Sequence, residues 1–553
     1  MNELPLDQSQ QDEGLDPTNP FSEGHAERRM EEWEATEPFS EGHVEQRITE
    51  TNATRQAPPA TCSDTETDQK LFRIWDLEVG HLACRLLIQP GDPSRFRSDS
   101  KTGQVEHLSR ASRFQDDTQR HIKCIAVKQG QEDSTYCIQE PISLELYYDS
   151  QSDGVALVNK STKLLRLFKP RETDDATPGS NETHVPPYEI RKAEPGAWVV
   201  KQSDGSTAFQ LLLFPRRYSC QLYEPKEIPG VAGSKRSRSE KQTPAAPVSG
   251  VFQPARKIDV FRDIQQGQKL RVVNGHGDEE YHVVRLRKAG VSGVAEVFQA
   301  LVSTHPKQVV VVKALKAHPN PVIRAKLWNR EFSMHRNLRS GFIIRLLGGD
   351  ARLNSLVLEY YDALDLGRRS RWRNASGFFS GNDTDANRVL CDMSRALEYL
   401  EQRGVGHNDL KPFNILYGKE GAKLIDFGHA TFGPQRIDGG TPWYVGPEYI
   451  FLQKRTASDD VWALGIVMLY LLKLIPLPDL GQVPGWQIND VRGPQSRAGQ
   501  SMRTWLATIE HVKERLTREV PLHSVVQKML VASSGNRITA RELVASVSGL
   551  HLR

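Results

Sequence analysis

The sequence predicts a multidomain protein in which a polar tail and a small all-β domain precede a larger α+β domain. Three observations lead to this prediction. The 553 residues exceed the size at which single cores stop growing, about 250–300 residues. Several short runs within residues 71–222 alternate between apolar and polar side chains, which is typical of strands. Residues 461–475, in the C-terminal half, form an apolar run interrupted by Lys473, which predicts a buried helix.

The first segment, residues 1–70, contains 17 acidic and 5 basic side chains, a net charge of −12. The remainder of the chain carries +15, because 67 basic and 52 acidic side chains are left. Few apolar residues are available to offset chain entropy, so we expect a disordered, solvated tail. An acidic tail that folds back onto a basic body is the alternative.

The tail also contains a duplicated motif. The sequence PFSEGH at residues 20–25 recurs at residues 38–43. Two copies are too few for a solenoid. A duplicated docking peptide with a phenylalanine anchor and a neutral duplication remain alternative interpretations.

Residues 71–222 are expected to form a small β-sandwich or barrel. Apolar alternation marks residues 143–148 and 164–168, residues 154–159 and 198–200 look similar, and residues 209–214 form an apolar run. Polar sequences rich in Asp, Ser and Gly separate these runs and supply turns. The regular spacing of short strands favours an all-β domain.

This segment faintly resembles a forkhead-associated domain, a reader of phosphothreonine. The resemblance rests on the strand rhythm and on the sequence DSQSD at residues 149–153, which leads to LVN at residues 157–159. It implies a phosphopeptide partner. The Gly-Arg, Ser-x-x-His and Asn-Gly elements of that family are not found here, which places the ligand site in doubt.

Residues 223–265 are expected to be a flexible linker, because they are rich in Pro, Ala, Gly and Ser. A basic cluster formed by Lys235, Arg236, Arg238 and Lys241 favours nuclear import, with a solvated charged run as the alternative. No secretion signal is expected, and the six cysteines form no CxxC pair. We therefore expect a nuclear or cytoplasmic protein without a nucleic-acid or membrane partner.

The most informative motifs lie in residues 281–550. The sequence HNDLKPFNIL at residues 407–416 precedes LIDFG at residues 424–428. Together they resemble the catalytic loop and the metal-binding motif of eukaryotic protein kinases. The resemblance implies ATP-dependent phosphoryl transfer within a two-lobed α+β fold. It assigns Asp409 as the catalytic base, Lys411 as a charge that faces the transferred phosphate, and Asn414 and Asp426 as Mg²⁺ ligands.

The resemblance extends upstream to residues expected to bind ATP. The strand VVVVK at residues 309–313 ends in Lys313, which is expected to grip the α- and β-phosphates. Eighteen residues later, Glu331 begins a segment that resembles the mobile helix whose glutamate pairs with this lysine. A charged lysine in such a site needs a carboxylate partner to stay oriented.

The sequence SLVLEYY at residues 355–361 resembles the strand and hinge between the two lobes of the family. Leu358 is expected to lie beside the adenine, and the backbone of Glu359 and Tyr361 is expected to bind the base. Asp365 is expected to reach the ribose hydroxyls.

Downstream, GTPWYVGPE at residues 440–448 resembles the end of a kinase activation segment. The resemblance predicts that Glu448 pairs with Arg537, and that Asp460 caps a helix and braces the catalytic loop. Thr441 and Lys411 favour a serine/threonine kinase over a tyrosine kinase. The only hydroxyl side chains between Asp426 and Glu448 are Thr431, Thr441 and Tyr444.

Two departures from the family pattern stand out. The glycine-rich loop, aligned on Val297, keeps Gly290 but has Ser292 and Ala295 in the next two glycine positions, so weaker gripping of ATP is expected. Asn408 stands where most members have an arginine that receives an activation-loop phosphate. We therefore expect activity that does not depend on phosphorylation of this loop, or control through the N-terminal half.

The sequence as a whole predicts a protein serine/threonine kinase that acts on protein substrates with ATP and Mg²⁺. A pseudokinase is the main alternative, and a phosphopeptide-binding adaptor with a regulatory kinase domain is a second. Pseudokinases usually lose at least one of five residues that this chain retains: Lys313, Glu331, Asp409, Asn414 and Asp426.

Overall fold

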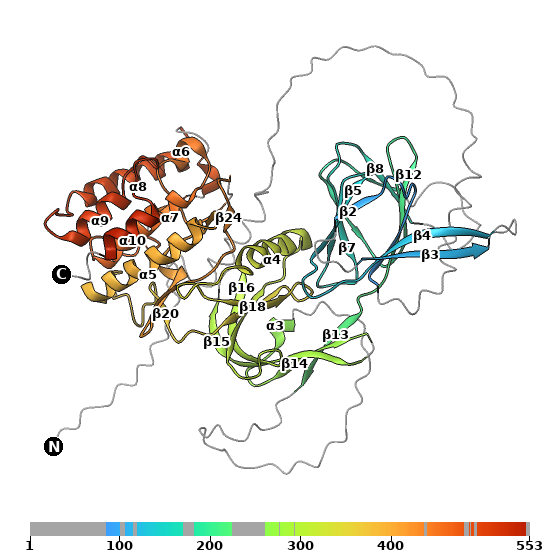
Figure 1. The fold of residues 1–553 in the computed structure, drawn as a ribbon, viewed down its shortest axis with the longest axis horizontal. Coiled ribbons are helices and arrows are strands. Elements are labelled where there is room, and N and C mark those ends of the chain that lie inside the picture. The colour runs from blue at the N-terminus through green and yellow to red at the C-terminus, as the bar shows by residue number, and fades with distance from the viewer. Residues whose placement is uncertain are drawn as a thin grey trace, which may run out of the picture. The chain divides into compact units, whose positions relative to one another are not determined.

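The computed structural model describes most of the chain beyond residue 83 (Figure 1). The described residues are 84–99, 105–113, 119–169, 182–223, 260–275, 277–291, 294–435, 439–480, 486, 488–491 and 495–548. The expected tail, the duplicated motif and the basic cluster lie outside them. The described chain forms two compact units, one with residues up to 336 and 346–360, the other with residues 337–345 and from 361 onward.

The all-β domain belongs to the first unit and consists of two antiparallel sheets, as the strand pattern predicted. The first sheet has the order β3-β4-β1-β12-β11-β8-β9 and the second β10-β7-β6-β5-β2. The strands of the first sheet are β1 (Leu86–Pro90), β3 (Val105–Arg113), β4 (Gln119–Val127), β8 (Leu165–Phe168), β9 (Glu182–Val185), β11 (Gly196–Lys201) and β12 (Thr207–Leu213). Those of the second are β2 (Arg97–Asp99), β5 (Thr135–Glu140), β6 (Leu144–Tyr148), β7 (Val155–Asn159) and β10 (Ile190–Ala193).

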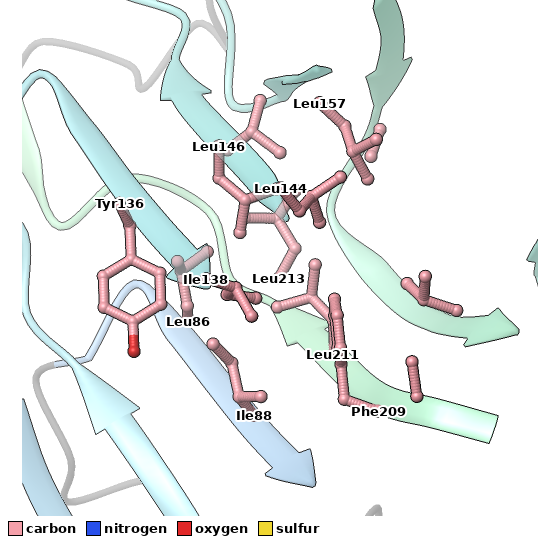
Figure 2. Close-up of a cluster of buried hydrophobic side chains, with 14 of the residues drawn as sticks. Leu86, Ile88, Tyr136, Ile138, Leu144, Leu146, Leu157, Phe209, Leu211 and Leu213 are labelled. Carbon is pink, nitrogen blue, oxygen red and sulfur yellow. The ribbon is translucent and has the colours of Figure 1, made fainter. Parts of the chain in front are cut away.

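Side chains from both sheets meet in one hydrophobic core (Figure 2). Leu86 and Ile88 of β1 contribute from the first sheet, and Leu144 and Leu146 of β6 from the second, all fully buried. Alternate residues of a strand point to the same face, so the alternation in the sequence places these leucines inside. Each buried aliphatic side chain stabilises the fold by about 1.5–3 kcal/mol relative to exposure.

A third sheet follows in the same unit, with the order β13-β14-β15-β16-β17-β19-β18. Its strands are β13 (Tyr218–Tyr223), β14 (Lys269–Asn274), β15 (Glu279–Val291), β16 (Ala295–Val302), β17 (Val310–Leu315), β18 (Leu346–Asp350) and β19 (Ser355–Glu359). The unit also contains the short helix α3 (Val260–Asp263) and the helix α4 (Pro321–His335).

The order of this sheet corrects two expected boundaries. The strand β13, which begins within the segment assigned to the all-β domain, pairs along its whole length with β14 and belongs to the third sheet. The last residues of the expected linker are folded, because Phe261 and Ile264 are buried in the core of that sheet. The strand β13 and the segment around α3 each contain too few apolar residues to show a periodic pattern. Their structure is therefore determined by the segments on which they pack.

The second unit is mainly helical. Its longer helices are α5 (Asp383–Glu401), α7 (Ala457–Leu471), α8 (Arg497–Lys513), α9 (Pro521–Met529) and α10 (Ala540–Ser548), with the single turn α6 (Tyr449–Leu452). Short strands form two small sheets: β20 (Leu364–Asp365), β22 (Ile415–Gly418) and β23 (Gly421–Leu424) in one, and β21 (Val405–Gly406) with β24 (Thr431–Phe432) in the other. The apolar residues 461–471 lie in α7 and are buried, and none of the helices described is long and apolar enough to cross a membrane.

Candidate active site

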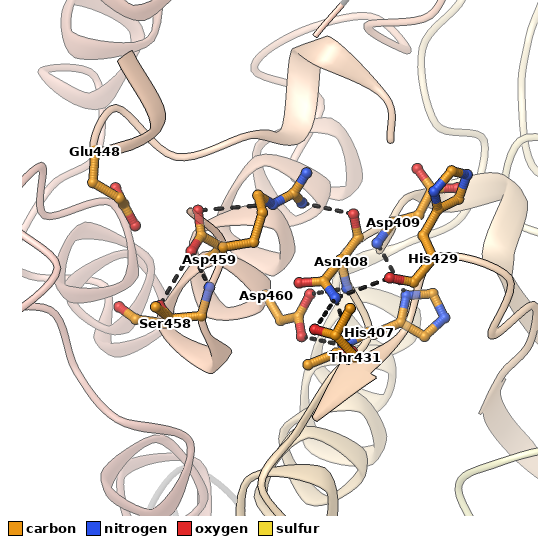
Figure 3. A network of polar contacts seen from close by, with 12 residues as sticks. His407, Asn408, Asp409, His429, Thr431, Glu448, Ser458, Asp459 and Asp460 are labelled. Atoms are coloured by element: carbon orange, nitrogen blue, oxygen red, sulfur yellow. Dashed lines mark hydrogen bonds and ion pairs between the residues drawn. The ribbon is translucent and has the colours of Figure 1, made fainter. Parts of the chain in front are cut away.

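The predicted catalytic loop runs between the strands β21 and β22 of the second unit. It includes a single 3₁₀ turn at Pro412–Asn414. Asp460 of α7 accepts hydrogen bonds from the backbone N–H groups of His407, at 2.7 Å, and Asn408, at 2.8 Å (Figure 3). A buried carboxylate that accepts two backbone N–H groups fixes the path of the loop. The expectation that Asp460 braces the loop is confirmed.

The carboxylate of Asp409 lies at the centre of a hydrogen-bonded cluster. Lys411 Nζ lies 2.9 Å from Asp409 Oδ2. The hydroxyl of Thr441 donates to Asp409 Oδ1 at 2.8 Å and accepts from Lys411 Nζ at 2.7 Å. Asn414 Nδ2 donates to Asp409 Oδ2 at 3.0 Å and to its backbone carbonyl at 2.7 Å. Thr441 thus bridges the aspartate and the lysine, as predicted.

The charges of this cluster are set by opposing effects. Burial disfavours the ionised form of Asp409, but Lys411 and His429 outweigh burial and hold the pKa of Asp409 below its ordinary value. Burial likewise disfavours the charged Lys411, but Asp409 and Asp479 raise its pKa above the ordinary value. At neutral pH the site therefore presents a carboxylate that can accept a proton and an ammonium that can face a phosphate.

Asn408, the departure from the family pattern, is fully buried. Its Nδ2 lies 3.0 Å from the carbonyl oxygens of Gly406 and His429 and 3.1 Å from Thr431 Oγ1, and its two N–H groups are shared among these three acceptors. The backbone of Asn408 is left-handed, with φ 65°, a conformation that asparagine adopts more readily than arginine. The asparagine thus joins the catalytic loop to the residues that follow the DFG motif. Thr431 is itself buried.

Asp426 follows the strand β23 and also has a left-handed backbone, with φ 67°. The backbone N–H of Ile425 donates to the carbonyl of Asn414 at 3.0 Å, which ties the two predicted metal-binding segments together. Both Nδ2 contacts of Asn414 are used within the loop, so its Oδ1 is the atom suited to a cation. A carboxylate and an amide oxygen are ligands of the kind that Mg²⁺ prefers, so these residues fit the ion.

The predicted lysine and glutamate pair lies in the other unit. Lys313 of β17 donates to both carboxylate oxygens of Glu331 of α4, each at 2.8 Å. Both residues are buried, and the pair is confirmed. Since breaking a buried ion pair leaves an uncompensated charge, this contact fixes α4 against the sheet.

The remaining predicted ATP-binding residues lie on both units. In the first unit Gly290 and Val297 pair across β15 and β16, and Glu359 ends β19. Residues 292 and 293 of the loop between β15 and β16 lie outside the described residues. In the second unit the hydroxyl of Tyr361 donates to the carbonyl of Gly421 at 3.0 Å. Asp365 is buried and pairs with Arg368 at 2.9 Å, and burial raises its pKa.

Two structural predictions have different outcomes. Arg537 binds both carboxylate oxygens of Glu448, at 2.7 and 2.8 Å, as predicted. The cap of α7 is supplied by Asp459, which accepts from Thr456, and not by Asp460 as expected. Adjacent aspartates at a helix N-terminus point in different directions, so only one can reach back to the N-cap residue.

Arg455 is a residue that the sequence did not reveal. Its guanidinium is buried and donates through Nη2 to the backbone carbonyl of Asn408 at 2.7 Å. It lies 3.9 Å from Asp459, one helical turn away in sequence. A cation under the catalytic loop is thus supplied from outside the loop. The spacing of Arg455 and Asp459 was the only available signal, and such pairs are common on helices.

The comparisons with known proteins agree with this geometry. The family described as "Protein kinase domain" matches residues 283–547. "Aurora kinase" of Schizosaccharomyces pombe is 28% identical over 211 residues, which cover 36% of this chain and 58% of that protein. "Ribosomal protein S6 kinase alpha-4" of Mus musculus is 29% identical over 230 residues, 39% of this chain and 26% of that protein.

A third relative, "Cytokinesis protein sepH" of Emericella nidulans, is 27% identical over 280 residues, 47% of this chain and 20% of that protein. The matched region thus spans 20–58% of the length of these three relatives. The family match and the retained Asp409, Lys411 and Lys313–Glu331 contacts lead to one conclusion. Residues 283–547 form a eukaryotic protein kinase domain.

Proposed function

We propose that this chain is an active protein serine/threonine kinase that uses ATP and Mg²⁺. The observation that carries the proposal is the arrangement around Asp409, in which Thr441 accepts from Lys411 and donates to Asp409. In the kinase family, a threonine that bridges the catalytic aspartate and a lysine is typical of serine/threonine kinases. The family match supports the protein kinase class, and the choice of Ser and Thr is the finer part of the proposal.

The proposed reaction requires positioning and charge neutralisation more than covalent catalysis. The oxygen of a Ser or Thr hydroxyl attacks the γ-phosphorus, and the bond from that phosphorus to the β,γ-bridging oxygen breaks. Asp409 accepts the hydroxyl proton, and Lys411 offsets the negative charge on the transferred group. ADP leaves with the electron pair of the broken bond.

In the first unit, the proposed role of Lys313 is to hold the α- and β-phosphates while Glu331 keeps its ammonium group oriented. Asn414 and Asp426 are the proposed Mg²⁺ ligands, and the bound ion supplies neutralisation of phosphate charge. Gly290, Val297, Glu359, Tyr361 and Asp365 are proposed to surround the nucleotide.

The alternatives make different demands on the residues. A pseudokinase does not need all five of the retained polar groups, and retention of the full set favours turnover. For the phosphopeptide adaptor, the loop residues on which the resemblance to a forkhead-associated domain rests make hydrogen bonds within the all-β domain itself. The carboxylate of Asp149 accepts hydrogen bonds from the backbone N–H of Gln151 and the hydroxyl of Ser152. The side chain of Asn159 donates to the carbonyls of Lys163 and Val185 and accepts from the hydroxyl of Ser161. We keep phosphopeptide binding and nuclear entry through the basic cluster as secondary proposals.

The test is a phosphotransfer assay on the purified full chain with γ-labelled ATP, Mg²⁺ and a mixture of protein substrates. The proposal predicts label in protein, and a loss of about 10³-fold or more in Asp409→Asn. Nucleotide binding without transfer in the parent chain would support the pseudokinase.

A further inference from the structure

Helix α4 contains Glu331. One face of the helix packs on the third sheet (β13-β14-β15-β16-β17-β19-β18), here called the kinase sheet. The rings of Trp328 and Phe332 stack with their centroids 4.7 Å apart, and both side chains pack with Leu346 and Leu356. The indole N–H of Trp328 donates to the carbonyl of Ser355 at 2.9 Å. This face resembles the usual buried side of an amphipathic helix.

A second face of α4 is also buried, and its partner is the all-β domain. Val322 and Ala325, each 3% exposed, lie in one cluster with Tyr147, Ala156 and Val158 of β6 and β7. The neighbouring residues of these strands point into the core of the β-sandwich. The outer face of this sheet is thus apolar where a solvated face would be polar, and α4 covers it.

Polar contacts accompany this apolar cluster. Arg324 Nη1 donates to Ser150 Oγ of the all-β domain at 3.2 Å, and its Nη2 donates to the carbonyl of Leu315 in the kinase sheet. At the other end of the helix, Arg336 pairs with Glu132 at 3.0 Å. The helix is therefore held at both ends by residues of the all-β domain.

We propose that the all-β domain positions α4 for catalysis, so that Glu331 stays paired with Lys313. The inference rests on the proposed kinase function. Ala325 and Arg324 are positioning residues, since they contact the all-β domain and act through Glu331. A helix held on one face only can shift, and a shift separates a buried pair that orients the ATP-binding lysine. The all-β domain favours the paired state by binding that state alone.

The first test replaces Ala325 by arginine in the full chain. Arginine preserves helix propensity but does not fit the contact with Tyr147 and Ala156. The proposal predicts a fall of about 10-fold or more in kcat/KM for ATP, carried mainly by KM, and faster amide hydrogen exchange over residues 321–335. The control is Asn329→Ala, one helical turn further along α4, where the side chain is exposed; it leaves both measurements unchanged. Parent-like kinetics and exchange in Ala325→Arg would overturn the proposal.

The second test keeps the proposal falsifiable if Ala325→Arg does not fold. Glu132→Arg and Arg336→Glu each place like charges together, and the double variant restores an opposite pair. Each single variant is expected to raise KM for ATP by about two- to fivefold and to speed exchange in α4, and the double variant to return both toward the parent. Single variants without effect, or a double variant as impaired as the worse single, would overturn the proposal.

Hydrogen exchange separates this inference from the proposed function. If the parent chain transfers no phosphate but the exchange pattern follows the charge-reversal cycle, then the kinase proposal fails and the positioning of α4 stands. If phosphate transfer is robust but neither interface variant changes KM or exchange, then the kinase proposal stands and the positioning role fails.

Discussion

The side-chain amide of Asn408 donates a hydrogen bond to Thr431 Oγ1 at 3.1 Å, inside a region where both side chains are buried. The same nitrogen also donates to the carbonyls of Gly406 and His429. In kinases with arginine at this position, phosphate on the activation segment neutralises a cation next to the catalytic aspartate. Here a neutral amide joins the two segments without phosphate.

Activity is therefore expected to be independent of phosphate on the activation segment. Phosphatase treatment of the purified chain is predicted to change the phosphotransfer rate by less than about twofold. The reason is that Asn408 replaces the catalytic-loop arginine that would bind a phosphate on the activation segment. The measurement is the phosphotransfer rate before and after treatment, with mass spectrometry of residues 426–448. A large loss traced to a phosphate in this segment would show that another cation, such as Arg455, receives it.

Replacement of Asn408 by aspartate tests the amide directly. Aspartate has the same shape and tolerates the same left-handed backbone, but it donates no hydrogen bond and brings a charge toward two carbonyls. We expect a fall of about 10- to 100-fold in kcat. Thr431→Val and Thr431→Ser form a matched pair, since only serine keeps the hydroxyl. Serine is expected to retain activity and valine to lose part of it, and equal activity of the two would contradict the role of this bond.

Lys313→Met and Asp426→Asn are each expected to lower phosphotransfer by about 10³-fold or more, because each removes a charge that neutralises phosphate in the proposed mechanism. Circular dichroism and thermal unfolding check that the variants fold. Near-parent rates in either variant would show that its role is wrongly assigned.

The pair formed by Glu448 and Arg537 is expected to stabilise the fold rather than the transition state. The carboxylate of Glu448 and the guanidinium of Arg537 are nearly fully buried, so removal of either partner leaves an uncompensated charge. Arg537→Met is predicted to lower the free energy of unfolding by about 3–5 kcal/mol, and the double variant with Glu448→Leu by less than that. Denaturant unfolding measures both, and a double variant that costs the sum of the singles would contradict this account.

Asp459 predicts a pH dependence of stability. Burial, with the nearby Glu448 and Asp460, raises its pKa to about 6 although Arg455 opposes the shift. A folded-state pKa above the ordinary value means that the folded protein binds the proton more tightly. Its contribution to stability is then largest below about pH 4 and is lost as the pH rises through 6.

Compared with Asp459→Asn, which removes the titration and keeps an oxygen to cap α7, the parent should lose about 1–3 kcal/mol of stability between pH 4 and 7. Thermal unfolding of both proteins across this range measures the difference. The exposed Glu519→Gln serves as a control that should follow the parent. Parallel curves for the parent and Asp459→Asn would show that Asp459 titrates normally.

A residue could be identified from the sequence where its role depends on its neighbours along the chain. Lys411, Thr441 and Glu331 were identified because their motifs have fixed spacing, and the predicted contacts are present. Arg455 was missed because its partner is a backbone carbonyl of a distant loop, and a carbonyl leaves no signal in the sequence. The position of a cation beneath that loop follows only from the tertiary fold.

The strands show the same limit. An apolar run identified β12, and alternation identified β6 and β8, since the apolar side chains of these strands lie in hydrophobic cores. Neither pattern identified β13, which pairs with β14 across a break of 45 residues in sequence between Tyr223 and Lys269. The apolar outer face formed by Tyr147, Ala156 and Val158 was not predicted either, because its partner α4 lies far away in the sequence. Contacts between distant segments therefore account for most of what the sequence left open.

The chain is proposed to transfer phosphate to Ser or Thr. The most direct test of this proposal uses peptide libraries that differ only in the acceptor residue, Ser, Thr or Tyr, with labelled ATP and the purified chain beside Asp409→Asn. We expect label on the Ser and Thr libraries, little on Tyr, and about 10³-fold less with the variant. Label mainly on tyrosine, or a parent chain that binds nucleotide but transfers no more phosphate than Asp409→Asn, would contradict the claim.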